Sequence, residues 1–289
     1  MKIIPAMLVF FLLLGVKAIS AAEVFSGTLA EHLATNAAAR VTIPPDLQPF
    51  RAPNSLGLDR ITGAAWSRTC WLHDVQGLPA TPIGFTNYPG GQGLMTMVSP
   101  RHFLCATHMH PEAFLAAFLD TNNVVHYRHG VQRLDVGSDT SVGILDEDLP
   151  ASVGFLPVLP ANFTNYLSAT STNFFQGIGM NQEFYLFGQS LNFGSPGLAC
   201  WSPEKNIAGG LAKEWNLVVR GGDSSNPVLL LISNRLVLVS HNWTARSGPN
   251  YAYQIADINA KMHLLSINNH LASDYQLTEF SLTNWPAIR

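Results

Sequence analysis

Short runs of apolar and β-branched residues, separated by Gly, Pro, Asn and Asp, fill the chain between about residues 62 and 253. Such runs are typical of β-strands, and the residues between them are typical of turns. Many short strands at this spacing favour a sandwich or barrels over alternating strand–helix units. The clearest runs are 94–98, 102–106, 123–127, 141–145, 184–187, 217–219, 228–232 and 235–240.

Apolar residues at helical spacing predict one helix near each end of this β-rich region. The first covers residues 23–40 and stops before Pro44. The second begins near Asp257, which can cap it. Residues 41–60 are rich in Pro and predict a linker or a strap over the surface. One face of the second helix is expected to carry Ile258, Met262, Leu265 and Ile267.

The first 22 residues have the pattern of an export signal. Lys2 supplies a positive start, residues 3–16 are almost wholly apolar, and residues 20–22 are small enough for cleavage. The apolar run is shorter than the roughly 20 residues that a membrane-spanning helix needs. Because Lys17 follows the run closely, a retained signal anchor is the alternative. We expect a secreted protein, extracellular or periplasmic, with no membrane attachment after signal removal.

The composition excludes some partners. Removing residues 1–22 leaves 14 basic and 19 acidic side chains, a net charge of −5. Phosphate backbones are bound by concentrated Lys and Arg, so nucleic acid is not an expected partner. Hydrophobic residues make up 47% of the chain, enough for one large core or two smaller ones.

The three cysteines are too few for a disulfide scaffold, since an exported chain could pair at most two of them. Cys105 lies within an apolar run and is expected to be a buried free thiol. A bond between Cys70 and Cys200 is then the only pairing to consider.

The sequence Gly-Gly-Asp-Ser-Ser-Asn-Pro at residues 221–227 is the strongest chemical signal, and an apolar strand follows it. A serine becomes a nucleophile when its hydroxyl is exposed, a base can take its proton, and donors await the oxyanion. Gly222 can adopt backbone angles that a Cβ would forbid, so its N–H and that of Ser224 could converge on one point. An ordinary turn between two strands is the alternative explanation.

Two other segments supply the partners that such a serine needs. Residues 98–108 form a turn, a buried strand and then His108 at the strand's end, a rigid place for a general base. In residues 137–145, Asp139 opens an apolar strand. A carboxylate there could be buried against the histidine, fixing its tautomer and stabilising the imidazolium.

Together these segments resemble the three signatures of the trypsin-like (chymotrypsin-fold) serine peptidases. The first resembles Leu-Ser-…-Thr-Ala-Ala-His, the second Asp-Ile-Ala-Leu-Leu and the third Gly-Asp-Ser-Gly-Gly-Pro. The order His, Asp, Ser is also that of the family. The resemblance covers about residues 62–270 and implies that His108, Asp139 and Ser224 are catalytic, with an oxyanion hole at Gly222 and Ser224. Spacings of 31 and 85 residues would take the first two from one barrel and the serine from the other.

The chain departs from the family pattern at two places. Ser225-Asn226 stands where relatives have Gly-Gly, so this turn must tolerate two side chains. Met109 follows His108 where animal relatives often have a cysteine, so the neighbouring disulfide is missing and packing alone is expected to hold that region.

The resemblance also suggests how the protein could be activated. Residues 60–64, Arg-Ile-Thr-Gly-Ala, resemble the activation site of animal zymogens. Cleavage after Arg60 would free an amine at Ile61 that pairs with Asp223, and residues 23–60 would be a propeptide. The alternative is that this segment simply enters the first strand and that Asp223 has another partner, as in relatives that need no activation.

Substrate binding is expected to involve Val218, at the position of the pocket floor in relatives, and Ser240, at the channel lining. Because nothing acidic stands at 218, an apolar or small side chain is the expected preference. Histidine pairs at 108/110 and 126/129 raise the alternative of a metal, but the spacing of known zinc motifs is missing. We expect neither metal nor cofactor.

The predicted fold class is mostly β, with two six-stranded antiparallel β-barrels of the trypsin-like type and a C-terminal helix. The predicted organisation is a signal peptide at 1–22, an N-terminal helix and linker at 23–60, a peptidase domain at 61–275 and a tail at 276–289. We expect a monomeric serine endopeptidase acting on a protein or peptide substrate. The alternatives are a weak or inactive relative that binds peptide or protein, and a serine esterase.

Overall fold

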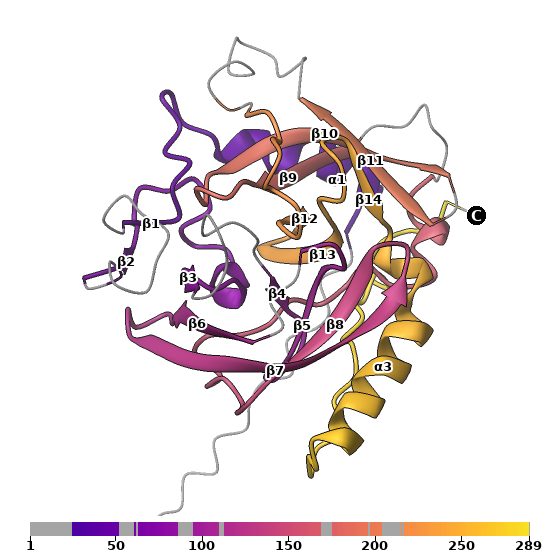
Figure 1. The fold of residues 1–289 in the computed structure, drawn as a ribbon. Coiled ribbons are helices and arrows are strands. Elements are labelled where there is room, and N and C mark those ends of the chain that lie inside the picture. The colour runs from indigo at the N-terminus through magenta and orange to yellow at the C-terminus, as the bar shows by residue number, and fades with distance from the viewer. Residues whose placement is uncertain are drawn as a thin grey trace, which may run out of the picture.

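A computed structural model describes residues 25–51, 61, 63–85, 95–109, 113–168, 175–195, 197–203, 215 and 217–288. The predicted export signal lies outside this part. Within the described residues, no helix combines the length and apolarity needed to cross a bilayer. Two curled antiparallel sheets of six strands each make up most of the fold, and Figure 1 shows them one above the other.

The first sheet holds the strands that flank His108 and Asp139. Its strands lie in the order β3, β6, β7, β8, β5, β4, and every neighbouring pair is antiparallel. Their bounds are β3 Gly84–Phe85, β4 Thr96–Met97, β5 His102–Ala106, β6 Phe114–Leu119, β7 Val125–Gly137 and β8 Thr140–Leu145.

The second sheet contains β12, the strand that follows the turn with Ser224. The order is β13, β12, β9, β10, β11, β14, again antiparallel throughout. The bounds are β9 Phe175–Met180, β10 Leu186–Ser195, β11 Leu198–Pro203, β12 Pro227–Ile232, β13 Arg235–His241 and β14 Ser247–Pro249.

The two sheets share one strand order. Numbered 1 to 6 in chain order, the strands run 1-4-5-6-3-2 across the first sheet and 5-4-1-2-3-6 across the second. When the two ends of each order are joined, both orders give the same closed ring of strands. The ring is open between strands 1 and 2 in the first sheet and between strands 5 and 6 in the second. A turn brings the opened ends together in the second sheet, where the Trp243 N–H donates to the Ser247 carbonyl at 3.1 Å. With the C-terminal helix, this confirms the predicted fold class.

Smaller elements complete the fold. Strands β1 and β2 form a separate antiparallel pair. These smaller elements are β1 Phe50–Arg51, β2 Ala65–Trp66, and the single 3-10 turns η1 Ala38–Arg40, η3 Leu78–Ala80, η4 Phe163–Asn165 and η5 Tyr251–Tyr253.

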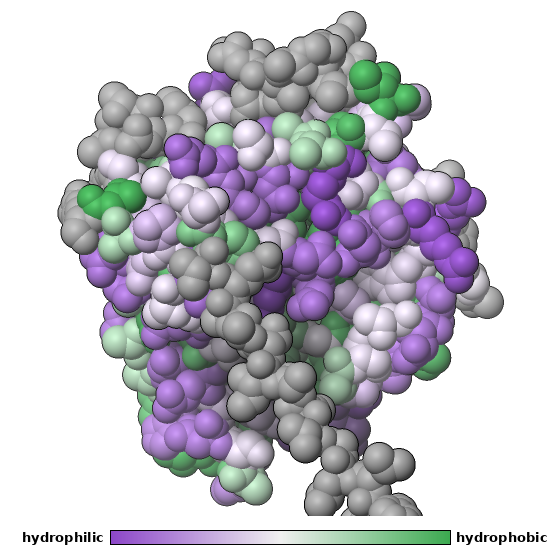
Figure 2. Space-filling view, turned by 180° about the vertical axis from the view of Figure 1, so that it is seen from behind, coloured by the Kyte–Doolittle hydropathy of each residue, from purple (hydrophilic) through white to green (hydrophobic). Residues whose placement is uncertain are grey.

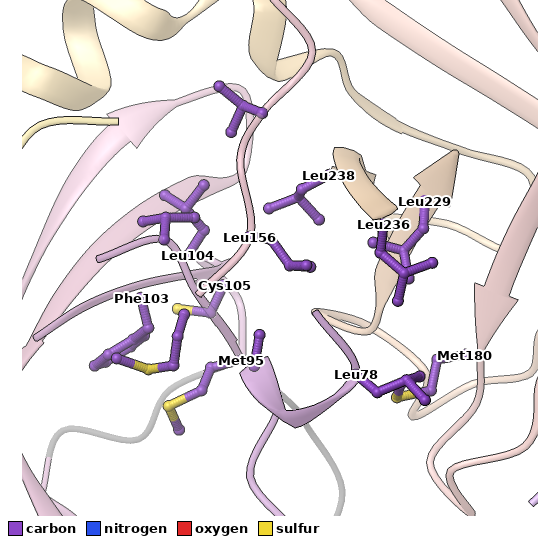
Figure 3. Packing of buried hydrophobic residues seen from close by; sticks show 14 of the residues in the cluster. Leu78, Met95, Phe103, Leu104, Cys105, Leu156, Met180, Leu229, Leu236 and Leu238 are labelled. Atoms are coloured by element: carbon purple, nitrogen blue, oxygen red, sulfur yellow. The ribbon is translucent and has the colours of Figure 1, made fainter. Parts of the chain in front are cut away.

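A large apolar cluster joins the two sheets. Figure 3 shows Phe103 and Leu104 of β5 on one side, Leu236 and Leu238 of β13 on the other, and Leu156 between them. The connecting segment is tied to both sheets. Leu156 donates its N–H to Met97 at 2.9 Å, and Leu238 donates to the next residue of the segment, Pro157, at 2.8 Å. Burial of this cluster, the main driving force for such packing, therefore fixes one sheet against the other.

The N-terminal helix α1, Leu29–Asn36, is shorter than predicted. The Thr28 hydroxyl accepts from the Glu31 N–H, and the Glu31 carboxylate accepts from the Thr28 N–H, which forms a capping box. Residues 25–28 precede the helix, whereas the prediction began at 23. The buried side chains of Leu29 and Leu33 pack in the core of the second sheet.

The C-terminal helix α3, Ile255–Asn268, has Gln254 at its N-cap, so the prediction that Asp257 caps it is wrong, and Asp257 lies in its first turn. The helix packs against the first sheet beside β7 and β8 (Figure 1). Ile258, Met262 and Leu265 are buried as expected. The placement of Ile267 on the same face is wrong, because its side chain is 55% exposed. At about 100° per residue, it lies almost opposite Leu265.

The strand predictions succeed where a long apolar run is buried on both faces. Strands β5, β8, β12 and β13 lie within one residue of their predicted bounds. The runs at 123–127 and 184–187 begin too early, because Asn123 and Phe184 adopt positive φ values of 64° and 63° in turns. Residues 217–219 form no strand.

The cysteines are all free thiols, so the pairing of Cys70 with Cys200 is not formed. The prediction that Cys105 is a buried free thiol is confirmed. Burial raises the pKa of Cys105 to about 11 and that of Cys70 to about 12, so both thiols stay protonated at neutral pH.

Large apolar side chains also occur singly on the surface. On the face drawn in Figure 2, residues of high hydropathy form small separate patches among hydrophilic ones. Val124, Tyr127 and Val131 of the β6–β7 hairpin are among the exposed apolar residues. Scattered exposure of this kind is normal for a folded domain.

Candidate active site

His108 is presented by the end of a rigid strand. All five residues of β5 are buried, and β5 pairs with β8 through five residue pairs from His102↔Ile144 to Ala106↔Thr140. Two residues beyond this strand, the His108 side chain remains 45% exposed. A buried strand therefore fixes the backbone beside an accessible imidazole.

Asp139 lies in the two-residue turn between β7 and β8. Ser138 and Asp139 have φ values of 51° and 58°, in the left-handed region that a tight turn between twisted strands requires. Asp and Asn tolerate this region better than most residues. The turn directs Asp139 toward the end of β5, where its carbonyl accepts the Thr107 N–H at 2.9 Å.

The structure brings the three predicted residues into one hydrogen-bonded chain. Asp139 Oδ2 lies 2.6 Å from His108 Nδ1, and Asp139 Oδ1 accepts the His108 backbone N–H at 3.0 Å. His108 Nε2 lies 2.9 Å from Ser224 Oγ. An ionised carboxylate only accepts, so Nδ1 carries the proton and Nε2 is free to accept from the serine hydroxyl. A general base needs this tautomer.

The Ser224 turn is held by the buried carboxylate before it. Asp223 is 1% exposed. Its Oδ2 accepts the Arg220 N–H at 2.7 Å, and its Oδ1 accepts the Gln182 N–H at 2.8 Å. Burial raises the pKa of Asp223, and these backbone donors oppose that shift. The carboxylate thus already has partners in the intact chain.

In the predicted activation step, cleavage after Arg60 would free an amine at Ile61 to pair with Asp223. Ile61 is buried against Ile83, Ala117 and Leu119 of the first sheet, and Arg60 lies outside the described residues. Cleavage after Arg60 therefore stays a prediction.

The predicted oxyanion donors come from the same turn. Gly222 has a φ of 98°, which favours glycine, and both Gly222 and Ser224 are partly exposed. Within the described part of the chain, the backbone N–H groups of these two residues have no hydrogen-bond acceptor. Both remain available to a negatively charged oxygen.

The two side chains that replace Gly-Gly fit into the turn and are fully buried. Ser225 adopts a φ of 71°, and its hydroxyl accepts the Ala106 N–H at 2.7 Å. Asn226 donates its N–H to the Asp223 carbonyl at 3.1 Å, and its own carbonyl accepts the Asn242 N–H at 2.9 Å. Two bonds of this turn are ones that a glycine could not form: that of the Ser225 hydroxyl, and that from Asn226 Nδ2 to Asp223 Oδ1 at 3.4 Å.

The expectation that packing alone holds the region after His108 is wrong. From β7, the Arg133 guanidinium donates from Nη1 to the Thr107 carbonyl at 2.8 Å and to the Met109 carbonyl at 3.4 Å. These two carbonyls lie on either side of His108. A charged side chain therefore braces the segment that lacks a disulfide.

A second side chain braces the aspartate turn. Gln254, just before α3, accepts from the Thr140 hydroxyl at 3.0 Å and donates to the Gly137 carbonyl at 3.3 Å. These residues directly flank the two-residue turn with Asp139. Single residues with no distinctive local motif supply both braces, so the sequence offered no signal for either.

A buried histidine lies behind the site. His241, at the end of β13, is 1% exposed, and its Nδ1 is hydrogen-bonded to the Tyr251 hydroxyl. The pKa of His241 is lowered to about 3, mainly by burial and also by the nearby charge of His108, whereas a hydrogen bond to the Asp139 backbone opposes the shift. This imidazole is neutral at physiological pH.

The two residues expected to bind substrate are placed differently. Val218 is 61% exposed in an irregular segment. Ser240 is fully buried in β13 opposite Val228, and its hydroxyl donates to the His241 carbonyl at 3.0 Å. Neither residue is hydrogen-bonded to His108, Asp139 or Ser224, so their role in binding substrate stays a prediction.

The alternative of a metal site gains no support from the described residues, where no three His, Cys, Asp or Glu side chains are grouped to hold an ion. His126 instead pairs with the buried Asp120, with 3.1 Å between Nε2 and Oδ2. His110 lies outside the described part.

Comparison with known sequences assigns no family to this chain. No protein-family model and no curated protein matches the sequence. Among solved structures, that of kallikrein-related peptidase 10 aligns with 63% of this chain and 94% of that chain, at 13% identity and a TM-score of 0.43. The shared strand order of the two sheets and the helix after them define the class: a mostly β protein of the trypsin-like fold.

Proposed function

We propose that the protein is a secreted serine endopeptidase with His108, Asp139 and Ser224 as its catalytic triad. The observation that carries this proposal is the continuous chain of hydrogen bonds from Asp139 through His108 to Ser224 Oγ. Function is argued from such a site and not from the fold, since one fold serves many functions.

In the proposed acylation step, Ser224 Oγ attacks the carbonyl carbon of a peptide bond while His108 Nε2 takes the hydroxyl proton. Asp139 stays ionised, holds the ring in place and stabilises the imidazolium that forms. The N–H groups of Gly222 and Ser224 would bind the oxyanion, each contributing about 3 kcal/mol at comparable sites.

Breakdown of the tetrahedral intermediate completes the reaction. His108 gives its proton to the leaving amine, and the acyl group remains on Ser224. Water then attacks the acyl-enzyme, with His108 again taking a proton, and Ser224 is released as the alcohol. No metal or cofactor enters these steps. The predicted preference for an apolar or small side chain belongs to this proposal.

Hydrolysis of unfolded casein by the wild type and by Ser224→Ala tests the proposal. Without the nucleophile, the rate should fall by roughly a thousandfold or more, because the remaining sites only bind the substrate and its transition state. Circular dichroism of both proteins checks that the variant is folded. Equal rates would leave only a protein that binds peptide.

Ester and amide substrates with the same acyl group separate a peptidase from an esterase. A peptidase should hydrolyse both through Ser224, whereas an esterase should hydrolyse the ester alone. Loss of ester hydrolysis in Ser224→Ala, with no amide hydrolysis by the wild type, would therefore replace the peptidase by an esterase.

A further inference from the structure

Ser225 directly follows the proposed nucleophile and has two unusual features. Its φ of 71° lies in the left-handed region, which glycine adopts far more readily than serine. Its side chain is completely buried. Strain of this kind persists where surrounding contacts compensate for it, and it concentrates at functional sites.

The compensating contact crosses between the two sheets. The Ser225 hydroxyl accepts the backbone N–H of Ala106 at 2.7 Å, across a sequence separation of 119 residues. Ala106 is the last residue of β5 and precedes His108 by two residues. One hydrogen bond therefore links the neighbour of the nucleophile to the strand that presents the general base.

The rest of the turn leaves this link little freedom. The Ser225 N–H donates to the Asn242 carbonyl at 3.0 Å, so the residue is fixed to the second sheet through its backbone and to the first through its side chain. A glycine would relieve the strain, but it would leave the Ala106 N–H without this acceptor in a buried position. Such a loss is unfavourable.

We propose that Ser225 is a positioning residue, whose hydroxyl sets the separation of Ser224 Oγ and His108 Nε2 across the two sheets. The inference rests on the proposed hydrolase function, because it concerns the geometry of proton transfer between those two atoms. It also predicts that the glycine typical of the related peptidases would be harmful here.

Two substitutions at Ser225 separate the effect of losing the hydroxyl from the effect of the strained backbone. Ser225→Ala removes the hydroxyl and keeps a Cβ at positive φ, whereas Ser225→Gly removes the hydroxyl and relieves the strain. We expect kcat for a peptide substrate to fall roughly tenfold to a hundredfold in both, since misplacement by about 1 Å can cost a hundredfold. KM should change less than about twofold, because the hydroxyl faces protein and not substrate. Ser225→Gly should melt at a higher temperature than Ser225→Ala.

A purely structural role predicts a different result, with activity following stability and Ser225→Gly more active than Ser225→Ala. Ser99 supplies a matched control at the other end of β5. Its buried hydroxyl accepts the His102 N–H at 2.8 Å, far along the strand from His108. Ser99→Ala should lower the melting temperature and leave kcat unchanged.

Amide hydrogen exchange at Ala106, followed by NMR, measures the link without any substrate. Exchange should be slow in the wild type and in Ser99→Ala, and faster in both Ser225 variants. An unchanged exchange rate, or an unchanged kcat in an active enzyme, overturns the positioning role alone. A wild type that hydrolyses neither peptides nor esters overturns the proposed function, and the positioning role with it.

Discussion

The two sheets support the candidate site in different ways. In the first sheet, His108 and Asp139 lie just beyond the ends of paired strands, so the β5–β8 ladder fixes them with backbone hydrogen bonds. In the second, Ser224 lies in an irregular turn, where buried side chains such as Asp223 hold the backbone. Regular pairing thus positions the proposed base and its carboxylate partner, and a local polar network positions the proposed nucleophile.

The difference fits what each group would do in the proposed reaction. An imidazole that accepts and returns a proton needs a fixed direction, which a rigid strand end provides. In that reaction, the turn with Ser224 would also have to keep two backbone N–H groups free for an oxyanion, and a regular strand would pair them. Side-chain acceptors can hold an irregular turn while leaving those donors available.

The largest expected effect is on kcat, and it comes from a substitution of Asp139, which the first sheet positions. In Asp139→Asn, the amide can donate to His108 Nδ1, which favours the wrong imidazole tautomer. We expect kcat to fall by roughly ten-thousandfold, as in serine peptidases with the same change. Steady-state kinetics on a peptide substrate measures it.

Asp135→Asn is the control, since Asp135 lies in the same hairpin and accepts from Thr107 Oγ1 at 3.2 Å without touching the imidazole. Its kcat should stay within about threefold of the wild type on the basis that it orients no reacting group. Comparable losses in both variants would show that the hairpin as a whole, and not the carboxylate on His108, matters.

A smaller effect is expected when the brace beside His108 is removed. Arg133→Met keeps much of the side-chain volume and loses the hydrogen bonds to the Thr107 and Met109 carbonyls. We expect about 2 kcal/mol less stability, from two backbone carbonyls left without a charged donor, and a roughly tenfold lower kcat from a looser His108. Urea unfolding and kinetics on the same samples measure both.

Arg101→Met is the matched control, because Arg101 donates to the Leu145 carbonyl at 2.9 Å and to the Asp146 carbonyl, beside the opposite end of β5. It should lose similar stability and no activity. If the two variants lose kcat equally, the brace beside His108 has no special role in positioning it.

The amino-acid sequence predicted more of the first sheet's part of the candidate site than of the second sheet's part. Strands β5 and β8 are apolar runs, of which β5 ends two residues before His108 and β8 begins directly after Asp139. A local pattern therefore revealed both the elements and their chemical groups. The partners of Asp223 and Ser225 are backbone N–H groups at Gln182 and Ala106, and every residue except proline has such a group. No residue type marks those contacts, and only the folded chain reveals them.

A further comparison of the two sheets concerns the pH dependence of stability, to which each sheet contributes one buried histidine. Burial lowers the pKa of His102 in β5 to about 4 and that of His241 in β13 to about 3. The unfolded chain, with histidine pKa values near 6.5, then binds more protons than the folded one. The free energy of unfolding should be highest above pH 6.5 and fall on acidification, by up to about 1.4 kcal/mol per pH unit for each histidine.

Urea unfolding at pH 7 and pH 5 measures this slope, with His102→Gln and His241→Gln as variants. Each variant should show a shallower fall than the wild type. The pKa of Asp223 is raised by burial, so its protonation favours the folded state and acts in the opposite direction. An equally steep fall in a variant would mean that its histidine is not buried in the neutral form.

The proposed function requires that segments from the two sheets meet where an imidazole can activate an alcohol. Treatment with a fluorophosphonate, followed by peptide mass spectrometry, tests it most directly, because the reagent reacts covalently with activated serines. We predict one adduct, at Ser224, formed by the wild type and by Asp135→Asn and lost in His108→Ala. Folded wild-type protein that takes up no label, or carries it on another serine, would contradict the proposed catalytic triad.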